Sequence, residues 1–203
     1  MAKKERELTK EEAEQLKRFA ELPPEKKLEL IEQQCIFCQI SKGKLETIKI
    51  FEDSGIIAAL DINPAVPGHT LIFPKQHFQF LFQLPPEVRE KIFLIASSLS
   101  IYLVNIMKAG GFNLYVANGA AAGQKMPHFV LHLIPRFEED GLSFDWDAKK
   151  TDQNELKKVA AVLRESLEKS MKEEKKKSKE DGERQKHEEK EAEHELKKFR
   201  RRG

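Results

Sequence analysis

Apolar residues are confined to the middle of this chain, and this confinement constrains the fold more than any other feature of the sequence. The aliphatic and aromatic side chains concentrate between Cys35 and Trp146, whereas both flanks are dominated by Lys, Glu, Arg and Gln. Flanks of this composition bury too little apolar surface to form a core. We therefore expect one globular domain with two polar extensions within the 203 residues.

The overall charge gives little indication of a partner. The chain carries 36 basic and 34 acidic residues, a formal net charge of +2, which is weak evidence for a nucleic-acid partner of the whole chain.

We find no apolar run that approaches the roughly 20 residues needed to span a bilayer. The first residues, MAKKERELTKEE, have no apolar signal-peptide core. We expect a cytoplasmic protein with no membrane contact.

The spacing of apolar residues predicts an α+β fold, an antiparallel sheet with a long inserted helix. From Pro86 to Met107 the apolar residues recur at intervals of three and four, which predicts one amphipathic helix, with Gly110 and Gly111 as its left-handed stop. Turn signals separate the expected strands, which are residues 48–51, 56–60, 70–73, 112–117 and 128–134.

Both extensions contain helical patterns. Residues 1–34 are expected to form two short helices, because Thr9 with Glu12 has capping-box spacing and Pro24 can open a second helix. Asp152 can cap a later amphipathic helix. The last residues are almost wholly Lys and Glu, which predicts a frayed helix or a disordered tail. The predicted parts are an N-terminal extension (1–34), a core domain (35–147), a C-terminal helix (148–171) and a charged tail (172–203).

The most informative segment is GQKMPHFVLHLIPR, residues 123–136. Alternate residues of a strand share a face, so His128, Val130 and His132 would point one way. Phe129 and the two leucines that follow would point the other way. One face therefore carries two histidines with a valine between them.

This segment resembles the signature of the histidine triad (HIT) family of nucleotide-binding proteins, His-φ-His-φ-His-φ-φ, where φ is apolar. The resemblance covers about residues 35–147. It extends to Asp61-Ile-Asn-Pro64, to Pro67-Gly-His-Thr70 and to Cys35-Ile-Phe-Cys38, which matches the start of many members. It implies a HIT-like antiparallel sheet and a homodimer, to which the long helix and Trp146 would offer apolar contacts.

In this family the middle histidine attacks the α-phosphorus of a nucleotide and forms a nucleotidyl-histidine intermediate. Val130 stands at that position and has no lone pair, so the resemblance implies that this chemistry is lost. His132 is two residues along the strand, roughly 6.6 Å away, too far for in-line attack from the same place. Whether any catalysis remains is left open by the sequence.

The resemblance also implies a nucleotide pocket, with a purine nucleotide or nucleotide conjugate as ligand. Asp61 matches the ribose contact, and His69 matches an outlying histidine that orients the triad. Asn118, Gly123 and Gln124 match the phosphate-binding loop, together with His132 as the third histidine of the triad. Taken alone, Asp61 and Asn118 are more often turn residues that bond their own backbone.

Two cysteines in a reducing compartment favour metal binding or thiol chemistry over a disulfide. Two cysteines with two residues between them can bind one tetrahedral metal ion, and two histidines can complete its coordination shell. By resemblance to the zinc-containing members, a structural zinc would be held by Cys35, Cys38, His77 and His128. The alternatives are a redox pair and buried polar residues that bind nothing. A redox pair usually lies at the start of a helix after a strand, whereas this one follows a predicted helix.

Three functions remain open at this point. The first is a nucleotide-binding protein without the usual chemistry. The second is an active nucleotidyl hydrolase or transferase that uses a displaced nucleophile or water. The third is a structural or RNA-associated module that acts through basic clusters in the tail, 175–177 and 200–202. The tail histidines, His187 and His194, are expected to be solvated.

Overall fold

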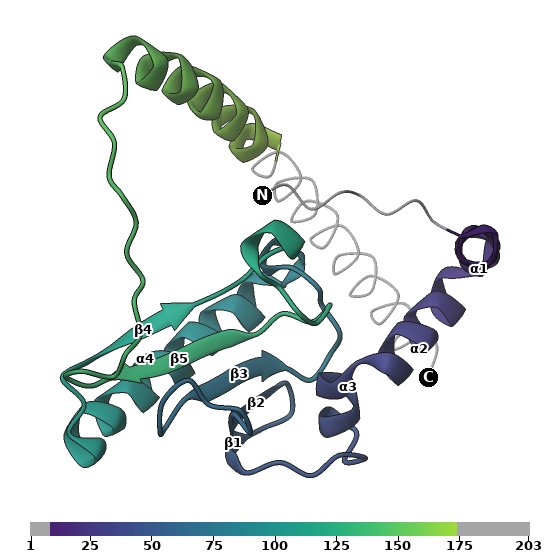
Figure 1. Ribbon diagram of the computed structural model, residues 1–203. Coiled ribbons are helices and arrows are strands. Elements are labelled where there is room, and N and C mark those ends of the chain that lie inside the picture. Colours follow the sequence, from purple (N-terminus) through teal and green to yellow (C-terminus); the bar gives the residue numbers. More distant parts are fainter. Residues whose placement is uncertain (1–8, 174–203) are drawn as a thin grey trace, which may run out of the picture. The chain divides into compact units, whose positions relative to one another are not determined.

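The computed structural model describes residues 9–173, and the chain divides into two units, Met1–Ser143 and Phe144–Gly203 (Figure 1). The first unit is built on one five-stranded antiparallel sheet with the order β1-β2-β3-β5-β4. The predicted α+β fold is confirmed. The strands are β1 Lys49–Glu52, β2 Ile56–Leu60, β3 Thr70–Pro74, β4 Gly111–Tyr115 and β5 Leu131–Arg136.

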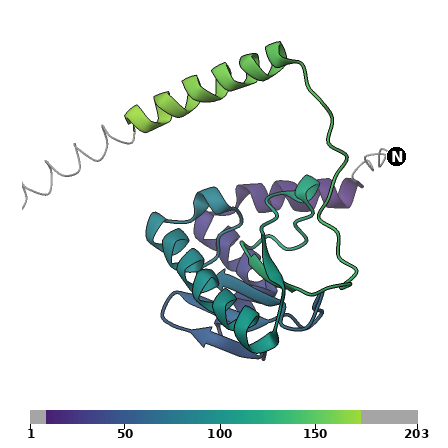
Figure 2. The same cartoon turned by 90° about the vertical axis from the view of Figure 1, so that its left-hand side faces the viewer.

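The long helix α4, Pro86–Met107, has the predicted bounds and covers one face of the sheet (Figures 1 and 2). Its Ile92 and Ala96 are fully buried in a core that includes Phe129, Leu131 and Leu133. The predicted stop at Gly110 is wrong: Lys108 adopts the left-handed conformation, with φ 57°, and Gly111 already opens β4.

By length and composition, α4 is also apolar enough to cross a membrane, and within residues 9–173 it is the one helix of which this holds. This qualifies the sequence expectation that no apolar run approaches such a length. In the folded domain α4 contacts β3, β4 and β5, and its buried residues complete the core of the sheet.

A second apolar cluster lies on the sheet face opposite α4. Short helix α3, Ile36–Ser41, contributes Phe37 and Cys38, which pack with Ile57, Phe73 and Val130. Helix α3 is not among the elements predicted from the sequence. The two expected N-terminal helices are present as α1, Lys10–Glu21, and α2, Pro24–Gln34. Thr9 precedes α1, as expected of a cap, and its carbonyl accepts from the Ala13 N–H.

Strand β5 begins at Leu131, three residues later than predicted. By extension of the register, Phe129 would lie opposite Pro74, which has no N–H, and the Pro74 carbonyl accepts from the His128 ring instead. The Phe129 N–H donates to the Phe78 carbonyl. The alternation of faces nevertheless holds, because Phe129 and Leu131 lie in the α4 core and Val130 lies in the opposite cluster.

In the second unit, residues 153–173 form a helix that follows Asp152 as predicted. Its apolar side chains, Leu156, Val159, Leu163, Leu167 and Met171, are exposed. The predictions for the charged tail beyond residue 173, including its basic clusters and His187 and His194, lie outside the described residues. The four predicted parts of the chain, with their boundaries, stay a prediction.

Candidate functional site

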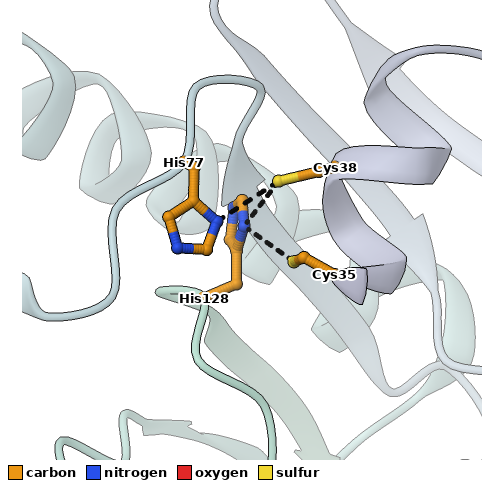
Figure 3. Close-up of side chains that lie close together, drawn as sticks. All are labelled: Cys35, Cys38, His77 and His128. Atoms are coloured by element: carbon orange, nitrogen blue, oxygen red, sulfur yellow. Dashed lines mark hydrogen bonds between the residues drawn. The ribbon is translucent and has the colours of Figure 1, made fainter. Parts of the chain in front are cut away.

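Four predicted metal ligands meet at one end of the sheet (Figure 3). Cys35 is the N-cap of α3 and Cys38 lies in its first turn, so the helical spacing of three places both sulfurs on one side. His77 comes from the loop after β3, and His128 lies three residues before β5. The ligand atoms of these residues all lie within 4.8 Å of one another.

The distances in this cluster fit one tetrahedral ion. The Nδ1 of His77 is 3.3 Å from the Cys38 Sγ, and the Nδ1 of His128 is 3.4 Å from the Cys35 Sγ and 3.6 Å from the Cys38 Sγ. Two ligands of a tetrahedral zinc, with bonds of roughly 2.3 Å to sulfur and 2.0 Å to nitrogen, lie about 3.5 Å apart. The arrangement therefore needs little adjustment to bind the ion.

The ionisation of this cluster disfavours redox chemistry. Burial, together with the neighbouring Cys35, raises the pKa of the Cys38 thiol to about 12, whereas a reactive cysteine needs a lowered pKa. Burial lowers the pKa of His128 to about 4, so its ring is neutral at pH 7. Its Nε2 donates to the Pro74 carbonyl at 3.0 Å, which leaves the Nδ1 lone pair facing the sulfurs.

A second group of polar side chains consists of Asp61, His69 and His132, and we call it the Asp-His-His cluster. Asp61 follows β2, His69 precedes β3 and His132 lies in β5, opposite Leu71. The Nε2 of His69 is 3.0 Å from the Nδ1 of His132, and the Nδ1 of His69 is 3.5 Å from the Asp61 Oδ2. The three residues were assigned to one pocket from the sequence, and the fold brings them together.

Val130 is buried, with 8% of its surface exposed, in the apolar cluster that also contains Cys35, Phe37 and Phe73. In the sequence it lies between His128 of the Cys2His2 cluster and His132 of the Asp-His-His cluster. Its side chain offers neither a lone pair nor a proton, and it fills space beside the metal ligands of α3. The face on which Val130 lies was predicted from the sequence, whereas its apolar surroundings were not.

The glycine-rich loop before β5 is held by its own side chains. The Asn118 Oδ1 accepts from the Leu81 N–H at 2.8 Å, and the Gln124 side chain bridges the Gly119 N–H and the Gln79 carbonyl. The N–H groups of Gly123 and Gln124 donate to carbonyls within the loop. These residues therefore fix the shape of the loop, and their predicted contact with phosphate stays a prediction.

A groove of about 450 Å³ was not predicted from the sequence. Ile62, the residue after Asp61, lines it and is 82% exposed. The signal in the sequence was the presence of Leu45 and Ile48 in an otherwise polar segment. The remaining lining residues are Gly43, Glu46, Thr47 and Lys49.

Comparison with known proteins agrees with this fold. The sequence profile of the HIT domain matches residues 42–139. An uncharacterized HIT-like protein of Borreliella burgdorferi is 41% identical over 54% of this chain and 81% of its own length. An adenosine 5'-monophosphoramidase of Saccharomyces cerevisiae is 37% identical over 69% of this chain and 87% of its own length. The chain belongs to the HIT family.

Solved structures of the family are similar to this one. A HIT family protein from Bacillus anthracis, 37% identical, superposes with a TM-score of 0.62 over 66% of this chain and 96% of that one. A Zn-bound histidine triad family protein from Mycobacterium smegmatis, 32% identical, has a TM-score of 0.52 over 67% of this chain and 99% of that one. The second of these supports a metal site at the Cys2His2 cluster.

Proposed function

We propose that this protein binds a purine nucleotide or nucleotide conjugate in a HIT pocket and that Val130 occupies the position of the family's nucleophile. The single observation that carries the second part is the placement of Val130. It is a buried apolar side chain on the face that carries His128 and His132 to either side. A valine cannot form a nucleotidyl intermediate, so binding is the function that the pocket retains.

The pocket offers each part of a nucleotide a suitable surface. The groove is lined by Leu45, Ile48 and Ile62, which suit a flat base. Asp61 is the first residue after β2 and is followed by Ile62, which lines the groove. Its carboxylate would therefore accept hydrogen bonds from the ribose hydroxyls of a nucleotide whose base lies in the groove. His132, which contacts His69, would contact the phosphate.

His132 is a poor substitute for the missing nucleophile. Its Nδ1 faces the Nε2 of His69 at 3.0 Å, so one of its two ring nitrogens is already engaged. Its other ring nitrogen is also displaced from the nucleophile's position, because His132 is roughly 6.6 Å along the strand from position 130. We therefore rank turnover with a displaced nucleophile, or with directly activated water, below binding without turnover.

Calorimetric titration with AMP, GMP and their phosphoramidates, alongside turnover assays, tests this proposal. We expect wild type to bind the nucleotides without turnover and Val130→His to gain hydrolysis of the phosphoramidates. Val130→Leu is the matched control, because it changes size without adding a nucleophile. Turnover by wild type comparable to that of Val130→His would contradict the proposal, and absence of nucleotide binding would favour the structural or RNA-associated role.

We further propose that the Cys2His2 cluster holds a structural zinc. All four positions of a tetrahedral shell are filled by protein, so such a site is closed to substrate, and it would fix α3 to the sheet. The bound ion would keep both thiols deprotonated. Metal analysis of protein purified without chelator should give one zinc at this site, lost in Cys38→Ser; protein without stoichiometric zinc would refute the proposal.

A homodimer is proposed from a separate observation. Helix α4 leaves Leu94, Ile101, Tyr102 and Ile106 exposed on the side away from the core, and β4 is an edge strand of the sheet. A contiguous apolar surface beside an unpaired edge is typical of a protein interface. Light scattering should give twice the mass of the chain, and Ile101→Glu should give the monomer; a monomeric wild type would refute it.

A further inference from the structure

The Asp-His-His cluster has a composition that suits a metal ion, separately from the Cys2His2 cluster. We propose that Asp61, His69 and His132 form a second metal site that binds a divalent transition-metal ion such as Zn²⁺, Co²⁺ or Ni²⁺. One ligand atom from each of the three residues lies within 4.8 Å of the others. Imidazole and carboxylate ligands together suit this group of metals.

The two imidazoles have the separation that one ion requires. The Nε2 of His69 and the Nδ1 of His132 are 3.0 Å apart. Two nitrogens that each lie roughly 2.1 Å from a shared metal are about 3.0 to 3.4 Å apart in octahedral or tetrahedral geometry. The ring centroids are 5.2 Å apart and the rings are tilted by 39°, so the nitrogens approach each other without stacking of the rings.

Backbone contacts orient His69 for this role. The Ala65 N–H donates to the His69 Nδ1 at 3.2 Å, so the ring proton resides on Nε2, between the two imidazoles. A metal ion would replace that one proton and bind both nitrogens.

Asp61 supplies the negative charge. Its Oδ1 accepts from the Asn63 N–H at 2.9 Å, which holds the carboxylate in place, and its Oδ2 lies 3.5 Å from the His69 ring. The carboxylate therefore offers an oxygen ligand close to the two imidazoles.

This second site differs from the Cys2His2 site in its ligands and its access. It has no sulfur ligand, and Asp61 and His132 are half-buried, so coordination positions remain open to water or an anion. It includes residues that we assign to the nucleotide pocket. The metal proposal does not depend on nucleotide binding, because it rests on the geometry of the three side chains alone.

Cobalt titration of the zinc-loaded, full-length protein without nucleotide tests the proposal. We expect one equivalent of Co²⁺ to bind with visible d–d absorption and without the thiolate-to-cobalt charge-transfer band that exchange at the cysteines would produce. His132→Asn and Asp61→Asn should each weaken this binding by at least about tenfold. The double variant His187→Ala/His194→Ala removes the histidines of the tail and should bind like wild type.

Circular dichroism and the one equivalent of zinc that the protein carries at the Cys2His2 cluster before the titration should match wild type in each variant, which shows that the fold and this cluster are intact. If His132→Asn is misfolded, His69→Gln provides a second test of the same ligand pair. The proposal is overturned by three results: no cobalt equivalent beyond exchange at the cysteines, undiminished binding in folded His132→Asn or His69→Gln, or loss of binding in the tail variant. None of these results bears on nucleotide binding.

Discussion

The Cys2His2 cluster and the Asp-His-His cluster are both assembled from distant parts of the chain around β5, yet they differ in burial. In the first, Cys35, Cys38 and His128 are buried where α3 packs against the sheet. In the second, Asp61 and His132 are half-buried, and Ile62, the residue after Asp61, lines an open groove. The closed cluster can contribute to stability, whereas the open one can admit a ligand.

The largest expected effect comes from breaking the closed cluster. Cys38→Ser should release the zinc and lower the free energy of unfolding by about 4 kcal/mol or more, because a tetrahedral site loses a ligand and α3 loses its anchor. Guanidinium denaturation with parallel zinc analysis measures this. Ser41→Ala, in the same short helix but outside the cluster, is the control. Equal stability of Cys38→Ser and wild type would show that the cluster is not structural.

A smaller loss is expected when position 130 is made polar. Val130→His places a larger side chain with polar nitrogens among Cys35, Phe37 and Phe73, which should cost about 1 to 3 kcal/mol. The measurement is the denaturation midpoint of the zinc-loaded protein, compared with Val130→Ile. If Val130→His were as stable as wild type, the side chain at position 130 would not be packed in the apolar cluster beside the cysteines.

Substitutions in the Asp-His-His cluster should lower the free energy of unfolding by a smaller amount. Asp61→Asn keeps the shape of the side chain and the acceptor for the Asn63 N–H, so the free energy of unfolding should change by less than about 1 kcal/mol. Nucleotide affinity, measured by calorimetry, should fall nonetheless. A loss of stability as large as that of Cys38→Ser would remove the distinction between the two clusters.

At neutral pH the smallest expected effect is that of His132 titration, which changes the stability only below about pH 6.5. Burial and the neighbouring His69 lower the pKa of His132 to about 4 in the folded state, from an ordinary value of 6.5. The unfolded chain therefore binds a proton more readily, and the stability due to neutral His132 is lost as the pH falls from about 6.5 to about 4. Denaturation midpoints across this range should fall less steeply in His132→Asn; parallel curves would contradict the assignment.

The sequence by itself determined the features that depend on local periodicity. The bounds of α4 follow from apolar residues spaced by three and four, and the opposite faces of Phe129 and Val130 follow from the alternation of a strand. The set of four metal ligands followed from residue types together with family resemblance. In each of these cases the information lies within a short segment or a motif.

The tertiary structure decided what depends on contacts between distant segments. Strand β5 starts at Leu131 because Pro74, in another strand, has no N–H to pair and gives its carbonyl to His128. Helix α3 is too short for a periodic signal and is packed against the sheet by its apolar residues. The 3.0 Å approach of His69 to His132 depends on the register of β3 against β5, which no local pattern specifies.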